Sequence, residues 1–222
     1  MTTTSSSLKR LLAAAMLFVA LPVTAFANDE PAHKAECRKP VYPHGALRQM
    51  QVGVSLIGFL VLPDGTVGKS IILSSSGSTS LDQEARSVLS TCVFKPASKD
   101  GSPIETWVRV KYVWSIDDES MGRAVREAAA DASKGNPAAY LRVSLLLSAI
   151  AKTDAERERA LLILLTAAEL GHPHAQFEAG RHFEKGLGVD ANAEKAQQWY
   201  QKAAAQGDLL AIQRMKTSVP VD

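Results

Sequence analysis

The pattern of hydrophobic and polar positions changes its period near Ile116, which divides the chain into two parts. Before this residue, apolar and β-branched residues form short runs or alternate with polar ones, as they do in strands. After it, alanine, leucine and other helix formers recur at helical spacing. The pattern predicts an α+β domain followed by an all-α region, with the acidic stretch 115–120 as the join and as a helix start.

Two of the predicted strands form a hairpin. The apolar runs 54–61 and 67–73 flank the dipeptide Asp64-Gly65, which is typical of a tight turn between antiparallel strands. The first part of the chain therefore contains an antiparallel sheet.

A serine-rich stretch, residues 74–80, follows the hairpin and leads into a segment with helical spacing from Leu81. We expect Ser80 and Gln83 to form a capping box, and Gly77 to occupy a position with positive φ. A serine nucleophile needs a neighbouring base and a turn such as G-x-S-x-G, and this turn is absent from the sequence. The serines are therefore interpreted as structural.

A third strand is predicted over residues 106–114, where apolar and polar residues alternate. One face carries Val108, Val110, Tyr112 and Trp114. Arg109 and Lys111 point to the other face, which we expect to be exposed to solvent.

The first 27 residues are predicted to be a signal peptide. Lys9 and Arg10 precede an apolar run, residues 11–23, and an A-x-A cleavage site ends at Ala27. The alternative is an uncleaved inner-membrane anchor, but as a helix this segment rises only about 25 Å against about 30 Å of hydrocarbon. We therefore expect export to the periplasm, and membrane association only if the segment is retained.

Charge and cysteine content limit the function classes. Cleavage after Ala27 removes two basic residues, which takes the formal net charge of +2 to zero. A neutral chain lacks the basic patch that nucleic acids or anionic membranes require. Cys37 and Cys92 are expected to form a disulfide in an oxidising compartment, with two buried thiols as the alternative. Neither cysteine has a second ligand at metal-binding spacing.

The second part of the chain repeats with a period of 36 residues, which indicates stacked helical hairpins. Glycines at one position are expected to end helices, and alanines at two others let helices approach closely. These repeat-defining residues are Gly135, Gly171, Gly207, Ala132, Ala168, Ala204, Ala139, Ala175 and Ala211. Pro137 and Pro173 suit the first turn of a helix, and Ser120 or Asn192 can cap one.

Clusters of titratable residues do not form a convincing catalytic or metal site. His172, His174 and His182 are expected at solvated turns and helix starts, with no carboxylate or cysteine to complete a metal site. Asp117, Asp118 and Glu119 are interpreted as helix-capping residues. We therefore predict no enzyme activity, no cofactor and no small-molecule substrate.

Residues 37–115 resemble the TonB C-terminal domain family in several motifs that follow in order: "KPVYPHGALRQ", "FLVLPDGTV", "SSSG", "LDQEA" and "FKPASKDGSPIE". The motif residues are Tyr42, Pro43, Gly53, Asp64, Gly65, Ser76, Gly77, Leu81, Asp82 and Pro96. The resemblance implies an αββαβ sandwich, with Cys37 before the first helix and Cys92 at the end of the second. The long spacer of a TonB energy transducer is missing.

The same family captures receptor segments by strand addition, which implies a role for the last strand. Its peptide-binding residues would be Val108, Arg109, Val110, Lys111 and Tyr112, if this strand lies at the sheet edge. The alternative is that Arg109 and Lys111 keep the edge from pairing, or that the helical region covers it. Residues 120–215 are similar to Sel-like tetratricopeptide-type repeats, which bind proteins through a concave face or, in so short an array, cover the first domain.

These expectations define five segments: a signal peptide at 1–27, a short linker at 28–36, a TonB C-terminal-like domain at 37–116, Sel-like repeats at 117–216 and a tail at 217–222. The predicted function is a periplasmic, non-enzymatic adaptor that binds a protein or peptide of the cell envelope. An outer-membrane receptor is one candidate partner. The alternative is a TonB-type energy transducer with an uncleaved N-terminal anchor.

Overall fold

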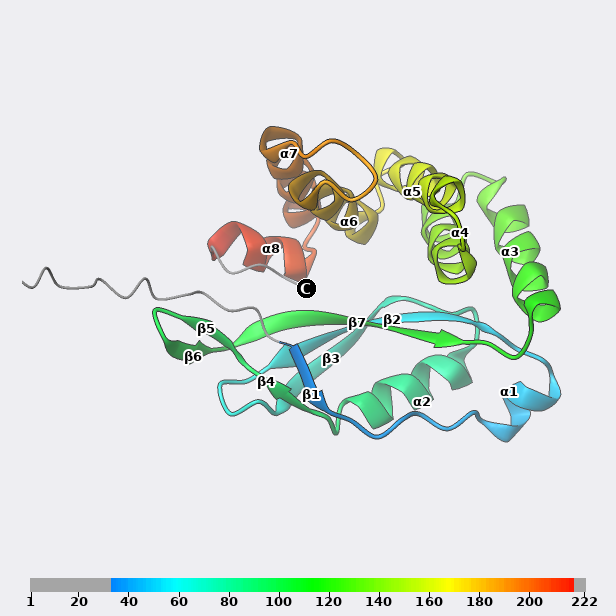
Figure 1. Cartoon of the computed structure of the whole chain (residues 1–222), viewed down its shortest axis with the longest axis horizontal. Coiled ribbons are helices and arrows are strands. Elements are labelled where there is room, and N and C mark those ends of the chain that lie inside the picture. The colour runs from blue at the N-terminus through cyan, green and yellow to red at the C-terminus, as the bar shows by residue number, and fades with distance from the viewer. Residues whose placement is uncertain (1–32, 218–222) are drawn as a thin grey trace, which may run out of the picture.

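The computed structural model describes residues 33–217, so the predicted signal peptide and residues 218–222 of the tail lie outside the described residues (Figure 1). Its centre is a three-stranded antiparallel sheet in the order β3-β2-β7. The strands are β2 (Gly53–Val61), β3 (Val67–Ser74) and β7 (Thr106–Trp114), at the three predicted places. The hairpin and the antiparallel α+β class are confirmed.

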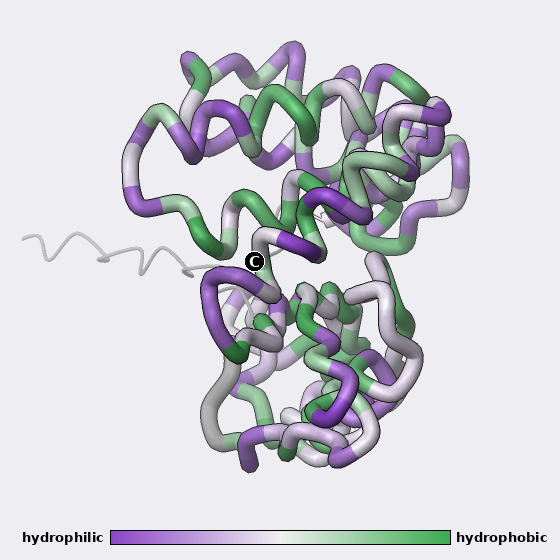
Figure 2. The backbone as a smooth tube through the Cα atoms, turned by 90° about the vertical axis from the view of Figure 1, so that its right-hand side faces the viewer, coloured by the Kyte–Doolittle hydropathy of each residue, from purple (hydrophilic) through white to green (hydrophobic). Residues whose placement is uncertain are grey.

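Helices cover both faces of this sheet. The short α1 (His44–Arg48) and α2 (Thr79–Leu89) lie on one side, and six further helices form a layer on the other (Figure 1). Figure 2 shows the helical layer and the sheet layer stacked on each other. The six helices are α3 (Asp118–Ala132), α4 (Pro137–Ile150), α5 (Asp154–Glu169), α6 (Pro173–Lys185), α7 (Ala193–Ala205) and α8 (Leu209–Lys216).

The core between the sheet and α2 follows from the alternation of side chains along the strands. Ile57 and Phe59 of β2 and Val108 of β7 are buried in one cluster with Leu81 and Ala85 of α2. These residues come from the alternate positions that share a face. The predicted apolar face of the last strand is confirmed.

The opposite face of β2 is buried under the helical layer. Val54 is fully buried and belongs to one cluster with Met121 of α3, Ala128 of α3 and Val143 of α4. Leu56, which shares this face, is also fully buried. The repeats therefore cover the sheet, as the alternative interpretation held.

The residues that recur every 36 positions have the expected roles at helix ends, helix starts and helix–helix contacts. Gly135, Gly171 and Gly207 have φ values of +82°, +92° and +85°, which end α3, α5 and α7 at little steric cost. Pro137 and Pro173 occupy the first turns of α4 and α6. All six alanines lie at helix–helix contacts. Ala139, Ala175 and Ala211, which follow the glycines in the sequence, are buried. Ala132 and Ala168, which precede the glycines, are also buried.

Some expected caps are wrong. The N-cap residue of α2 is Ser78 rather than Ser80, and its side chain makes no capping hydrogen bond. Ser80 and Gln83 therefore form no capping box. Asp117, rather than Ser120, caps α3, and its carboxylate accepts a hydrogen bond from the Ser120 amide at 2.7 Å. Asn192 caps α7 as expected. The interpretation of the acidic stretch as a cap is confirmed.

Four short strands were not expected. β1 (His33–Glu36) pairs with β4 (Val93–Lys95), and β5 (Ala97–Lys99) pairs with β6 (Ser102–Ile104). Residues 33–36, expected to lie in a linker, thus join the folded domain. Strands of three or four residues are too short to show alternation in a sequence.

The serine-rich stretch is organised by Asp82, a buried carboxylate of α2. It accepts hydrogen bonds from Ser55 Oγ at 2.6 Å, from Ser75 Oγ at 2.5 Å and from the Ser76 amide at 2.9 Å. Ser55 Oγ in turn accepts from Trp114 Nε1 at 3.2 Å. These bonds tie α2 to β2 and β7, which explains a polar Ser55 inside the sheet.

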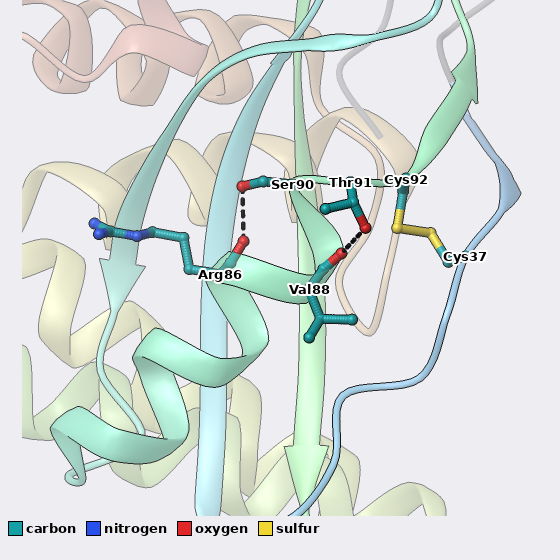
Figure 3. The surroundings of a disulfide bond; sticks show 6 residues. All are labelled: Cys37, Arg86, Val88, Ser90, Thr91 and Cys92. Atoms are coloured by element: carbon teal, nitrogen blue, oxygen red, sulfur yellow. Dashed lines mark hydrogen bonds between the residues drawn. A yellow bond between two sulfur atoms is a disulfide. The ribbon is translucent and has the colours of Figure 1, made fainter.

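A disulfide joins Cys37 to Cys92, as predicted (Figure 3). Cys92 follows α2, where Ser90 Oγ and Thr91 Oγ1 donate to the Arg86 and Val88 carbonyls, each at 2.7 Å. The bond closes a separation of 55 residues. It therefore holds the segment before α1 against the end of α2.

We expect replacement of both cysteines by alanine to lower the free energy of unfolding by about 4 kcal/mol, because the loop is no longer closed in the unfolded chain. Urea unfolding of the oxidised wild type and the double variant measures this difference. Reduced wild type is the control and should match the variant. Equal midpoints for oxidised and reduced protein would contradict the expectation.

Deletion of residues 136–222 is expected to leave a chain that aggregates, because only α3 then remains to cover the face of β2 with Val54, Leu56 and Leu60. Size-exclusion chromatography at increasing concentration measures this. Threonine at these three positions should restore a monomer in the truncated chain. A monomeric truncated chain without these substitutions would show that the sheet domain does not need the helical layer.

Candidate functional site

The candidate site lies along β7, which forms one edge of the main sheet. Its main-chain groups alternate between β2 and the outer side, as in any antiparallel pair. Trp107 bonds outward, to a helix rather than to its β2 partner Leu60. The outward-facing residues are therefore Trp107, Arg109, Lys111 and Val113.

The beginning of this edge is occupied by a side chain of α8. Gln213 Oε1 accepts a hydrogen bond from the Trp107 amide at 2.5 Å, and Gln213 Nε2 donates to the Trp107 carbonyl at 3.2 Å. The side-chain amide thus takes the place of a neighbouring strand at one position. Farther along, Lys111 and Val113 are exposed.

The five residues predicted to bind a peptide divide into two groups. Val108, Val110 and Tyr112 direct their main chain to β2 and their side chains toward α2. Arg109 and Lys111 direct their main chain outward and their side chains toward the helical layer. If a strand were added at this edge, it would meet the outward main chain of Lys111 and Val113 rather than that of Val108, Val110 or Tyr112.

The expectation of a solvent-exposed face around Arg109 is wrong. The Arg109 side chain is 20% exposed, and its Nε lies 3.0 Å from Glu178 Oε1 of α6. Alternation predicts which residues share a face, but it does not tell what covers that face. Here the helical layer covers it.

A buried charged network on α6 continues from this contact. His174, Glu178 and Arg181 are spaced by four and three residues, which places them on one side of the helix. Glu178 Oε2 accepts from Arg181 at 3.0 Å, and His174 Nε2 lies 3.5 Å from Glu178 Oε1. His174 Nδ1 lies 3.0 Å from the carboxylate of Asp208, which caps α8. The network connects β7, α6 and α8.

This arrangement corrects the expectation of solvated histidines. His174 is 3% exposed, and His172 accepts the Ala175 amide at the start of α6. His182 Nδ1 lies 2.6 Å from the Leu187 carbonyl. A signal for the network was present in the spacing of His174, Glu178 and Arg181, which sequence reasoning missed.

Burial and neighbouring charges set the pKa values in the network. Burial lowers the pKa of His174, but hydrogen bonds and charges of Asp208 and Glu178 outweigh burial, so the net pKa is raised. Burial raises the pKa of Glu178, but Arg109, His174 and Arg181 outweigh it and hold that pKa well below its usual range. Glu178 is thus an ionised carboxylate inside the fold.

A cavity of about 580 Å³ lies beside the network, between β7 and the helices α4, α5 and α6. Arg109, Lys111 and Glu178 line the side near the sheet. Leucines of α4 and α5 line much of the rest, together with polar residues. The cavity therefore adjoins the exposed part of the β7 edge.

The family-motif residues shape the domain around this edge. Gly53 lies so close to Ser76 that a Cβ would stand 2.3 Å from the Ser76 carbonyl oxygen. Asp64 accepts the Thr66 amide and Gly65 has φ of +85°, which form the hairpin turn. Tyr42 and Leu81 belong to the core between the sheet and α2, and Asp82 bonds to Ser55. Pro43 precedes α1, Gly77 has φ of +98°, and Pro96 lies between β4 and β5.

No helix within residues 33–217 combines the length and the apolar character that crossing a membrane requires. Within the same residues, no group of three histidine, cysteine, aspartate or glutamate side chains could hold a metal ion.

Two family models match the chain. The model for the Gram-negative bacterial TonB protein C-terminal region matches residues 38–116, and the Sel1 repeat model matches residues 173–208. Both families are typically non-catalytic.

Curated proteins match over part of their length. Chitin synthase regulator SKT5 of Saccharomyces cerevisiae is 38% identical over 88 residues, which is 39% of this chain and 13% of that protein. DAP3-binding cell death enhancer 1 of Mus musculus is 33% identical over 110 residues, 49% of this chain and 21% of that protein. The chain thus spans less than a quarter of the length of these relatives.

Solved structures match each part. A Sel1 repeat protein from Oxalobacter formigenes is 24% identical with a TM-score of 0.40, covering 46% of this chain and 44% of its own. The Pseudomonas aeruginosa TonB C-terminal domain is 23% identical with a TM-score of 0.35, covering 41% of this chain and 92% of its own.

We expect His174→Gln to destabilise the fold in a pH-dependent way. The pKa of His174 is higher in the folded chain, so its charged form stabilises the fold fully below the unfolded pKa of about 6.5. This contribution is lost as the pH rises through the folded pKa. The difference in unfolding free energy between wild type and variant, measured with urea, should shrink as the pH rises above about 6.5.

His172→Asn is the matched control, because asparagine can still accept the Ala175 amide. Burial lowers the pKa of His172, so the corresponding difference should grow as the pH rises through about 6.5. A difference for His174→Gln that stays constant with pH would contradict the expected charge on His174.

Proposed function

Because residues 38–116 are a TonB C-terminal domain and a Sel1 repeat region follows them, we propose that this chain is a non-enzymatic protein-interaction adaptor. It captures an extended segment of a partner at the outer edge of β7. In this proposal residues 37–116 supply the edge, and residues 117–216 cover the sheet and contact the bound segment.

The observation that carries the proposal is the exposed second half of the β7 edge. Lys111 and Val113 direct main-chain groups outward, and within residues 33–217 these groups have no hydrogen-bond partner. An extended segment pairs with such groups through its own main chain. The lysine side chain deters indiscriminate pairing, since charged residues at an edge oppose aggregation.

The proposed location is the periplasm. TonB C-terminal domains face this compartment, and the disulfide between Cys37 and Cys92 suits an oxidising environment. The partner would then be a protein of the cell envelope, for which an outer-membrane receptor is one candidate. The predicted signal peptide would release the adaptor, whereas a retained N-terminal anchor would support energy transduction instead.

Lys111→Pro is expected to reduce partner capture by about twofold to tenfold relative to Lys111→Ala, because proline removes an outward amide donor. The ladder with β2 is kept, since Lys111 directs no main-chain bond to β2. Crosslinking in native envelope fractions, followed by quantitative mass spectrometry of the captured proteins, measures the effect.

Val113→Pro and Val113→Ala form a second matched pair at the next outward position. Thermal unfolding of all four variants checks that they remain folded. Equal recovery of the same partners by the proline and alanine variants at both positions would refute strand addition at this edge.

A further inference from the structure

The cavity beside β7 determines which segments the edge can hold. It lies between β7 and the helices α4, α5 and α6, and Arg109 and Lys111 belong to both the edge and the cavity wall. A segment bound to the edge therefore also contacts the cavity. This inference rests on the proposed function and concerns the chemistry of the bound segment.

Strand geometry places alternate side chains of such a segment in the cavity. Directly opposed residues of paired strands project to the same face of the sheet. Arg109 and Lys111 project toward the helical layer, so the residues opposite them do the same. These two residues of the segment are separated by one residue whose side chain points away.

The two positions differ in charge. At the inner one, Arg109 is already paired with Glu178, which also binds Arg181. At the other position, Lys111 makes no hydrogen bond or ion pair within residues 33–217. Partial burial and the nearby Arg109 lower the pKa of Lys111, which disfavours its charged form, and the charge of Glu178 offsets only part of this effect. A carboxylate placed opposite Lys111 would offset that cost.

The helical wall of the cavity carries apolar side chains as well as charged ones. Leu141 and Leu145 of α4 and Leu161 and Leu164 of α5 line it. A branched apolar side chain that enters the cavity from the bound segment would contact these leucines and remove their surface from water. Because Arg109 is already paired with Glu178, an acidic side chain is expected opposite Lys111 and an apolar one opposite Arg109.

We propose that the cavity selects extended segments of partner proteins that carry an apolar side chain opposite Arg109 and an acidic side chain two residues away, opposite Lys111. The helical repeats supply the leucines and Glu178, while the sheet supplies the two cations and the pairing edge. Recognition is thus shared by both parts of the chain.

Selection from a library of random seven-residue peptides displayed on phage tests the proposal with the full-length protein. Enriched peptides are expected to carry an acidic and an apolar residue two positions apart. Lys111→Glu should replace the acidic preference by a basic one. Lys69→Glu, an exposed lysine of β3 on the other edge strand, is the control and should select the same peptides as wild type.

A synthetic peptide of the enriched sequence then measures the charge contribution. Replacing its acidic residue by the amide is expected to weaken binding to wild type about fivefold, and to leave binding to Lys111→Glu unchanged or stronger. Fluorescence anisotropy of the labelled peptide gives the dissociation constants.

The outcomes separate this inference from the proposed function. The inference alone is overturned if peptides bind and bind more weakly to Lys111→Pro than to Lys111→Ala, but show no pattern of acidic and apolar residues. No enrichment, or peptides insensitive to Lys111→Pro, would overturn both. The fatty acid laurate, which has an apolar chain and a carboxylate, tests whether the cavity binds a small molecule instead. If laurate binds tightly, Lys111→Glu abolishes this binding, and no peptide with the expected pattern is enriched, the inference is overturned.

Discussion

The burial of β2 on both faces is the constraint on which the other layers depend. All nine residues of this strand are buried, so apolar side chains on each side need a cover. The α2 helix covers Ile57 and Phe59, and the helical repeats cover Val54. The neighbouring β7 must then lie under the same repeats, which places Arg109 where water is scarce. Glu178 compensates for that burial, because a charged group removed from water needs an opposite charge.

Much of the fold could be predicted because its signals are local or periodic. The Asp64-Gly65 turn, the alternation over 106–114 and the 36-residue spacing of glycines each reflect one backbone requirement. The short strands β1, β4, β5 and β6 could not be predicted, because they contain too few residues to show a period. Their pairing depends on tertiary contacts.

The candidate site could be predicted only in part, because it depends on contacts between the two parts of the chain. Alternation placed Arg109 and Lys111 on one face, but a helix 69 residues later in the chain supplies Glu178. The register of β7 on β2 decides which main-chain groups point outward, and a sequence does not contain it. His174 aligns with Leu210 in the repeat, and both are buried. The period therefore indicated a buried position for His174, but the polarity of histidine led to the expectation of a solvated one.

The length of the exposed edge argues that main-chain pairing alone cannot hold a partner tightly. Gln213 occupies the Trp107 groups, and farther along the edge Lys111 and Val113 are the exposed outward residues. Each hydrogen bond contributes about 1 kcal/mol net, whereas association costs at least about 4 kcal/mol before the segment is ordered. One buried leucine-sized side chain adds about 1.5–3 kcal/mol. Affinity at this edge must therefore come largely from side chains in the cavity, which makes the helical repeats part of the binding site rather than only a cover for the sheet.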